Sequence, residues 1–267
     1  MSNNDLKMMG LAKVEIAEFN GMTAIRKEPV NLTEGYFYRE VLTQSGACAI
    51  SAPELLASPS DYELWIEYIP NAVDKDETSS SDFMKCLSNL HEAEIQLDDS
   101  QLFQFNWSAE DTERAIARFT ANQQYIITRA IPSYFERQQA LFAPMGPVSG
   151  DTNVFNWGRR SNGELVLFDW ERFGKASPAM DLAPMIPGLP PVEVIDHYCD
   201  RYLRERKTPT FNLAELRQQV LVAIAWLVIE VVNILHDREN AQATKYMDWF
   251  NQQFGCWLSK HLAYVES

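Results

Sequence analysis

Up to residue 70, apolar and polar positions mostly alternate in short runs, which is the period of strands. In 13–19, for example, Val14 and Ile16 stand between charged neighbours. Asn20-Gly21 follows, and this pair readily takes the positive φ angles of a two-residue hairpin turn. A small antiparallel sheet is therefore predicted, with strands at 13–19, 22–27, 52–56 and 62–69.

Apolar residues recur at helical spacing through most of the chain after residue 80. The segment 71–80 is polar and rich in turn residues, so it is the predicted boundary between two lobes. Residues 220–235 are apolar on every side except at Glu230 and Asn233, which predicts a buried central helix. Helices are predicted at 36–42, 81–91, 109–130, 192–205, 213–236 and 244–263, with a short one from residue 181.

A second Asn-Gly pair, Asn162-Gly163, lies between two apolar runs and predicts another hairpin. If these two residues form the whole turn, Asn156 on one strand lies opposite Asp169 on the other. Opposed residues have Cβ atoms about 4.5–5.5 Å apart. An amide oxygen and a carboxylate at that distance can share one Mg²⁺, which prefers oxygen ligands and usually keeps water and substrate phosphates.

Asp151 precedes this hairpin in a glycine-containing turn, where a free carboxylate can meet an incoming hydroxyl. Taken alone, an aspartate in a turn usually bonds its own backbone, and Asn156 has an equally ordinary explanation. Asp169 is harder to explain in that way, because an unpaired charge at the end of an apolar run is costly. Together, the three residues indicate a metal-phosphate site.

The strand 22–27 ends in two cations, Arg26 and Lys27, either of which can reach an anion in a cleft. Glu40, on the predicted helix that follows, can pair with one of them. A solvated strand end is the ordinary alternative for both cations.

The composition excludes several classes of protein. A chain of 267 residues can bury a sizeable core, and its formal charge of −14 argues against a nucleic-acid surface, which needs clustered Lys and Arg. That charge is compatible with cationic small substrates. The four cysteines are too widely spaced to indicate a zinc site or a disulfide framework. With no secretory signal and no apolar run long enough to span a bilayer, we expect a cytoplasmic protein without a membrane partner, of unknown oligomeric state.

The order of these motifs resembles the aminoglycoside phosphotransferase and choline kinase family, within the protein-kinase-like superfamily. The matching residues are Ser149-Gly150-Asp151, then Asn156, Asp169-Trp170 and Asp181-Leu182-Ala183. The resemblance extends from about Lys13 to the end of the chain. It implies an α+β, two-lobed fold, in which 1–70 form a small antiparallel-sheet lobe that binds nucleotide. Residues 71–267 would form a larger helical lobe with a catalytic β-hairpin and an acceptor site.

By this resemblance, the protein would be a kinase that moves the γ-phosphate of ATP to a hydroxyl of a small, possibly cationic molecule. Asp151 would orient or deprotonate that hydroxyl, while Asn156 and Asp169 would hold Mg²⁺ on the phosphates. Asp181 would support the loop. Trp170, Trp226 and Glu230 are candidates for a cationic acceptor pocket, with core packing as the ordinary alternative.

In the first lobe, the resemblance assigns the phosphate-contacting cation to Arg26 or Lys27 and makes Glu40 its helix partner. Glu67-Tyr68-Ile69 resembles the hinge that receives adenine through its backbone.

Three features depart from the family pattern. Ser149 stands where the family has a histidine that braces the loop, and Arg26 stands at the position of the usual lysine. Only about a dozen residues, with Gly10 as their sole glycine, precede Lys13, so the first lobe is apparently truncated. A catalytically weak or inactive kinase-like binding module is therefore the alternative to an active enzyme. An unrelated metal hydrolase built on the same carboxylates is a more distant one.

Overall fold

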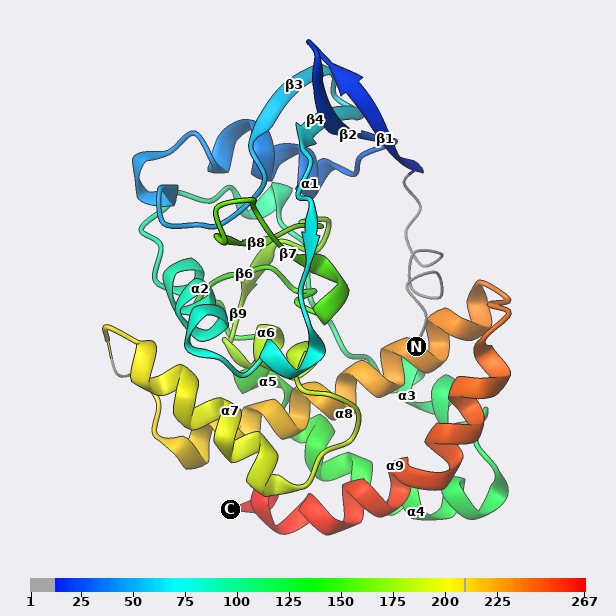
Figure 1. Cartoon of the computed structure of the whole chain (residues 1–267). Coiled ribbons are helices and arrows are strands. Elements are labelled where there is room, and N and C mark those ends of the chain that lie inside the picture. Colours follow the sequence, from blue (N-terminus) through cyan, green and yellow to red (C-terminus); the bar gives the residue numbers. More distant parts are fainter. Residues whose placement is uncertain (1–12, 209) are drawn as a thin grey trace.

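The computed structural model describes residues 13–208 and 210–267. The predicted truncation of the first lobe, with Gly10 as the sole glycine ahead of Lys13, falls on residues 1–12. These residues lie outside the described part of the chain. Figure 1 shows a small sheet at one end of the molecule and a larger, mainly helical part at the other, with short strands between them.

Four antiparallel strands form the small sheet, in the order β1-β2-β4-β3. Their bounds are β1 Lys13–Phe19, β2 Met22–Glu28, β3 Leu55–Ser60 and β4 Glu63–Glu67. Asn20 and Gly21 have φ angles of 51° and 79° and form the whole turn between β1 and β2, so the predicted hairpin is confirmed. β3 overlaps the predicted 52–56 only at its first two residues, Leu55 and Leu56, and continues to Ser60.

A short helix follows this sheet. α1, Leu32–Tyr36, continues as a π-helical turn, Phe37–Val41. The helix begins before the predicted 36–42 because Asn31 caps it: the Asn31 side chain accepts a hydrogen bond from the backbone N–H of Glu34 at 2.8 Å. Glu34 therefore lies in the first turn, where its side chain is buried.

The segment after the small sheet is an ordered connection. β5, Asn71–Ala72, pairs with β7 in a three-stranded sheet of order β5-β7-β8, and β6 pairs with β9. The bounds of these strands are β6 Gly146–Val148, β7 Trp157–Arg159, β8 Leu165–Leu167 and β9 Gly174–Ala176. These short strands carry the predicted catalytic segment between the small sheet and the helices (Figure 1).

The predicted single helix over 109–130 was wrong, because two helices occupy this region. Thr120 is extended, with ψ of 154°, and its backbone N–H donates to Asn251 Oδ1 at 2.8 Å instead of to an earlier turn. The helices after β5 are α2 Ser81–His91, α3 Ala109–Ile116, α4 Ala121–Glu136, α5 Gln138–Leu141, α6 Ala179–Met185, α7 Val192–Glu205, α8 Leu213–Asp237 and α9 Ala243–Glu266. The last three agree closely with the prediction.

The central helix α8 was predicted correctly. Its N-terminus has a capping box, in which Asn212 and Glu215 each accept from the other's backbone N–H. Although α8 is long and apolar enough to cross a bilayer by length and composition, 67% of its most apolar window is buried inside the fold. It packs against α3, α6, α7 and α9, and therefore forms the core of the helical part.

The first helix is attached to the catalytic hairpin by an aromatic stack. The rings of Phe37 and Trp170 lie 3.9 Å apart between centroids at an interplanar angle of 11°. The Asn31 side chain also donates to the backbone oxygen of Glu171 at 2.9 Å. These contacts position the end of the hairpin directly against α1.

Candidate active site

The catalytic hairpin differs from its predicted register by one residue. Arg160 N–H donates to Glu164 O and Gly163 N–H donates to Arg160 O, both at 2.9 Å, so the loop has three residues rather than two. Gly163 alone has positive φ, 88°, as in a turn that ends in a bulge. Asn156 therefore faces Phe168, whose N–H donates to Asn156 O, and the predicted direct pairing with Asp169 was wrong.

Asp169 nevertheless lies at the site, because the strand ends there in an unusual conformation. Its φ of 69° is left-handed, a conformation that costs energy for a residue other than glycine. The carboxylate Oδ1 accepts a hydrogen bond from Lys27 Nζ at 2.9 Å. The hairpin thus presents Asp169 to the small sheet.

Asp151 and Asn156 lie on one loop, 149–156, which we call the catalytic loop after its predicted role. Hydrogen bonds within this loop hold the two residues together. Asn156 Nδ2 donates to the backbone oxygen of Asp151 at 2.9 Å, and Asn153 Nδ2 donates to Asp151 Oδ1 at 2.7 Å. Desolvation raises the pKa of the Asp151 carboxyl above its usual range, and repulsion from Asp169 adds to the effect. A carboxyl with a raised pKa is a better proton acceptor once it is ionised.

The donor set at this site fits a hard cation. The backbone oxygen of Asp151 can only accept, so the atom of Asn156 that contacts it is the amide nitrogen, and Asn156 Oδ1 is the acceptor of that side chain. In Asp169, Lys27 binds Oδ1, and Oδ2 is the second carboxylate oxygen. Within 13–208 and 210–267 no cluster of three His, Cys, Asp or Glu side chains could hold a metal by itself. Two protein oxygens suit Mg²⁺, which takes its remaining ligands from water and phosphates.

Of the two predicted cations, Lys27 is the one that reaches the site. Its side chain is 8% exposed, and Nζ lies 2.7 Å from Glu34 Oε2 and 2.9 Å from Asp169 Oδ1. Burial alone would lower the pKa of Lys27, but the two carboxylates together raise it above its usual range. The ammonium therefore stays charged.

Arg26 lies on the opposite face, since successive residues of a strand point to opposite sides. Arg26 Nε donates to Glu63 Oε1 at 2.6 Å, and the guanidinium lies 6.0 Å from the ring of Trp65. The alternative in which Arg26 faces the site is therefore contradicted.

The predicted helix partner, Glu40, was also wrong. Glu40 is exposed, and Glu34 occupies the position beside Lys27. The sequence contained a signal for this: Asn31 followed by Glu34 is the spacing of a helix N-cap and its third residue, which places the helix start earlier. The prediction began the helix at residue 36 and so chose a glutamate six residues too far along the chain.

Of the three predicted hinge residues, Glu67 is the last residue of β4, and Tyr68 and Ile69 lie between β4 and β5. The Glu67 carboxylate binds Arg160 with two hydrogen bonds, 2.8 and 2.7 Å long, so this side chain is already paired. Tyr68 and Ile69 are half-buried, and Ile69 lies against Gly158 of β7. Contact of these residues with a nucleotide stays a prediction, and the Glu67 backbone N–H is already bonded to Glu54 O at 2.9 Å.

The candidate acceptor residues do not form an open cationic pocket. Trp170 and Trp226 are 1% and 3% exposed. The Glu230 carboxylate is held by Arg172, whose Nη1 and Nη2 each donate to it at 2.9 Å. The Arg172 guanidinium also lies 4.8 Å from the ring of Phe103. Core packing and an internal ion pair explain these side chains.

Arg172 is a site residue that the sequence reasoning missed. Its charge lowers the pKa of Asp151, in opposition to the larger effect of burial. Asp181 was expected correctly as the support of the loop: its Oδ2 and Oδ1 accept from the backbone N–H groups of Ser149 and Gly150 at 2.8 and 2.7 Å.

Comparison with known proteins relates this geometry to a fold. No family model and no curated protein matches the sequence. A choline/ethanolamine kinase family protein from Mesorhizobium loti is similar in structure, with a TM-score of 0.67 and 18% identity over 96% of this chain and 92% of that one. A spectinomycin phosphotransferase, solved with ADP and spectinomycin, has a TM-score of 0.60 and 12% identity over 96% and 90%.

The choline kinase LicA from Streptococcus pneumoniae is also similar, with a TM-score of 0.59 and 16% identity over 94% of this chain and 91% of that one. The chain has the protein-kinase-like fold. The predicted α+β architecture, with a small antiparallel sheet and a larger helical part, is confirmed. Within this kinase-like fold, Lys27, Glu34 and Asp169 meet between the sheet, the first helix and the hairpin.

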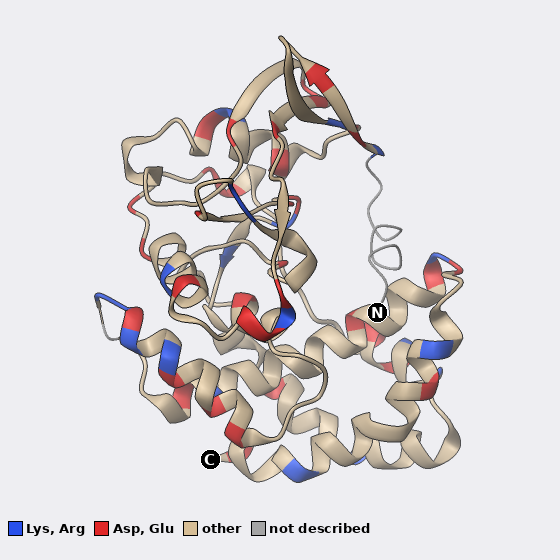
Figure 2. Cartoon of the chain, viewed as in Figure 1, with Lys and Arg blue, Asp and Glu red and all other residues tan. Residues whose placement is uncertain are grey.

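Basic and acidic residues are interspersed along the described parts of this kinase-like chain (Figure 2). Figure 2 shows Lys and Arg scattered among Asp and Glu along the described parts of the chain, in keeping with the formal charge of −14. Lys27 is a cation that the fold has brought inside, where two carboxylates neutralise it.

Proposed function

We propose that the protein is a small-molecule kinase that transfers the γ-phosphate of ATP, bound with Mg²⁺, to a hydroxyl group. The observation that carries this proposal is the contact of Lys27 Nζ with Asp169 Oδ1 at 2.9 Å. It brings a buried cation from the sheet to the carboxylate of the hairpin. Phosphoryl transfer needs such a pairing of cation and metal-binding carboxylate around the phosphates.

An apolar surface beside Lys27 supports a nucleotide as the donor. In β1 and β2, Val14 is paired with Lys27 and Ile16 with Ile25, so these four residues share one face of the sheet. Val14 and Ile16 are 57% and 66% exposed, which is unusual for large apolar side chains in a sheet. A flat base stacked on this face would cover them.

The chain's own residues account for most of the proposed chemistry. Asp151 would accept the proton of the acceptor hydroxyl, with Asn153 fixing the carboxylate from one side. Asn156 and Asp169 would hold Mg²⁺, which when bound would neutralise the phosphate oxygens. Lys27 would add a second positive charge there. Alignment of these groups is the main requirement, because the transition state of phosphoryl transfer is loose.

The similar structures support the same assignment of ligands. One of them was solved with ADP and spectinomycin, and LicA was also solved with AMP. For this protein we infer a cytoplasmic enzyme whose residues 1–70 bind the nucleotide and whose residues 71–267 bind the acceptor. The acceptor would be a small hydroxylated molecule, and the formal charge of −14 favours a cationic one.

The test is transfer of the γ-phosphate from Mg-ATP to a panel of hydroxylated amines and amino sugars, measured as phosphorylated product. We expect product with at least one acceptor, and a loss of about 10²–10⁴-fold in kcat for Asp151→Asn. Failure of the purified protein both to bind Mg-ATP and to phosphorylate any acceptor would refute the proposal. Binding of Mg-ATP without any transfer would indicate a kinase-like binding module instead.

A further inference from the structure

The buried carboxylate of Asp181 has a third partner that is remote in sequence. Besides the backbone N–H groups of Ser149 and Gly150, its Oδ2 lies 2.9 Å from Nε2 of His91, the last residue of α2. The side chains of His91 and Asp181 are 1% and 0% exposed. A carboxylate that is fully removed from water depends on such donors for its stability.

The hydrogen-bond network determines which way each proton points. Arg206 Nη1 can only donate, so Tyr202 accepts from it at 3.0 Å and is able to give its own hydrogen to His91 Nδ1, 2.7 Å away, while the acceptor-only carboxylate of Asp181 requires a hydrogen on Nε2. His91 Nδ1 is then an acceptor, and the ring hydrogen lies on Nε2. It is donated to Asp181. Every member of the network Arg206, Tyr202, His91 and Asp181 has one consistent role.

Ser149, by contrast, contributes only its backbone. The side chain of Ser149 is fully buried, and its Oγ has no hydrogen-bond partner among the described residues. The hydroxyl at this position therefore does not brace the catalytic loop. The imidazole that contacts the loop anchor comes from a different element, α2.

We propose that His91, oriented by Tyr202 and Arg206, is the positioning residue of the catalytic loop. By donating to Asp181 Oδ2, it holds this carboxylate in the orientation in which both oxygens accept from Ser149 and Gly150. Asp151 follows Gly150 directly, so its position depends on that anchor. This inference rests on the proposed phosphotransferase activity only for the role of Asp151, because the network itself is independent of the reaction.

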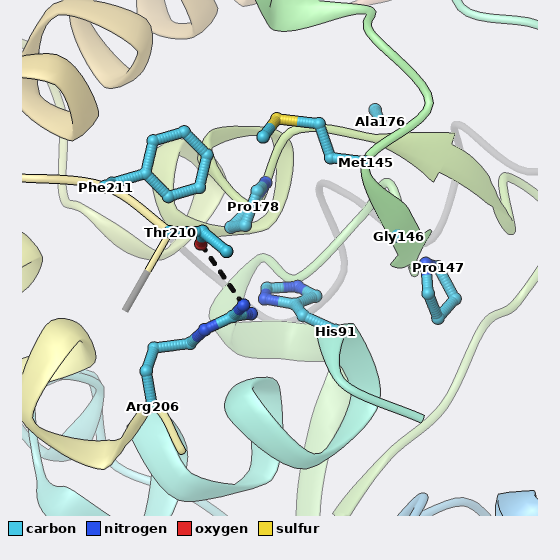
Figure 3. A pocket seen from close by; sticks show the side chains of 9 residues that line it. All are labelled: His91, Met145, Gly146, Pro147, Ala176, Pro178, Arg206, Thr210 and Phe211. Atoms are coloured by element: carbon cyan, nitrogen blue, oxygen red, sulfur yellow. Dashed lines mark hydrogen bonds between the residues drawn. The ribbon is translucent and has the colours of Figure 1, made fainter. Parts of the chain in front are cut away.

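A small cavity adjoins the ring of His91. Figure 3 shows the ring of His91 at a cavity of about 40 Å³, close to Pro178 and Arg206 and to Gly146 at the start of β6. Removing the imidazole would enlarge this space. Added imidazole can therefore be tested as a replacement for the missing ring.

The first experiment compares His91→Gln with His91→Met. Glutamine can place an N–H donor near the position of Nε2, whereas methionine fills the space without a donor. We expect His91→Met to lower kcat roughly ten- to a hundredfold, the range for residues that orient a functional group, with KM for ATP within about twofold. His91→Gln should keep most of the activity, and imidazole should partly restore His91→Gly.

A second pair of variants supplies the matched control. Tyr202 and Tyr198 both lie on α7 and both use a buried hydroxyl, but Tyr198 bonds to Thr78 at 2.7 Å and not to the network. Tyr202→Phe should lower kcat and Tyr198→Phe should not. Equal losses in these two variants, or equal activity of His91→Gln and His91→Met, would overturn the proposal.

Hydrogen exchange separates this inference from the proposed function. The amides of Ser149 and Gly150 should exchange faster in His91→Met and Tyr202→Phe than in the parent, and at the parent rate in Tyr198→Phe. Unchanged exchange in His91→Met refutes the positioning role. If the parent protein transfers no phosphate, the proposed function fails, while the exchange measurement still decides the role of His91.

Discussion

Lys27 is charged although it is buried, and its two carboxylate partners explain why the fold tolerates it. Glu34 and Asp169 lie 2.7 and 2.9 Å from Nζ. Without Lys27, the Glu34 carboxylate, whose side chain is 2% exposed, would have neither water nor a cation beside it, and such an uncompensated buried charge is strongly destabilising. Lys27 is therefore important for stability as well as for the proposed chemistry.

Replacing Lys27 with methionine should lower the free energy of unfolding by about 3–5 kcal/mol, because it leaves the buried carboxylate of Glu34 unpaired beside the half-buried one of Asp169. Arg26→Met is the matched control on the other face of β2, where the ion pairs are partly exposed, and should cost far less. Chemical denaturation measures both. Equal losses of unfolding free energy in the two variants would show that stability does not depend on which face of β2 carries the cation.

The ionisation of Asp151 predicts a pH dependence. Desolvation holds its pKa above the usual range of an aspartate, and the positive charge of Arg172 opposes that rise. A proton acceptor works only when ionised, so kcat/KM should increase with pH along an acidic limb set by Asp151. In Arg172→Leu this limb should move to higher pH. A pH–rate profile with an unmoved limb would contradict this assignment.

At the scale of elements, the catalytic hairpin shows how one turn decides a register. The sequence predicts a two-residue turn at Asn162-Gly163, but only Gly163 takes positive φ. A three-residue loop results, and Asn156 pairs with Phe168. Asp169 is left beyond the strand, where its left-handed backbone directs it to the sheet.

This turn geometry can be tested by alanine substitution. Gly163→Ala should lower the free energy of unfolding by about 1–2 kcal/mol, because φ is 88° while no atom lies within 4 Å of the added methyl group. Asn162→Ala should cost less, since Asn162 is not at positive φ and loses only the exposed hydrogen bond that its Oδ1 accepts from Glu164 N–H at 3.0 Å. In the first hairpin, Asn20 has φ of 51°, so Asn20→Ala should cost more than Asn162→Ala. Thermal unfolding of the three variants gives the comparison.

At the scale of the whole molecule, nucleotide binding should stabilise the fold, because the proposed site lies between the sheet and the helical part. A ligand that binds only the folded state adds about 2.7 kcal/mol at a concentration of one hundred times its Kd. We expect Mg-ATP to raise the melting temperature in this way, and ATP with a chelator to raise it much less. In Asp169→Asn the effect of Mg²⁺ should disappear. A rise that is equal with and without Mg²⁺ would contradict a metal site at Asp169.

Elements governed by local chemistry were predictable from the sequence alone. The Asn20-Gly21 turn follows from backbone preferences, and α7, α8 and α9 follow from helical periodicity. The spacing of Asp151, Asn156 and Asp169 also indicated one site, because a short hairpin keeps such residues together whichever register it adopts.

Contacts between distant segments were decided only by the tertiary structure. Which neighbour, Arg26 or Lys27, faces the site depends on which side of the sheet the helix and hairpin cover. The break before α4 depends on Asn251, and the anchor of the catalytic loop depends on His91. Hydrophobic periodicity depends on each segment by itself. Which charge becomes buried, and which donor a buried group receives, depends on the distant segments that pack against it.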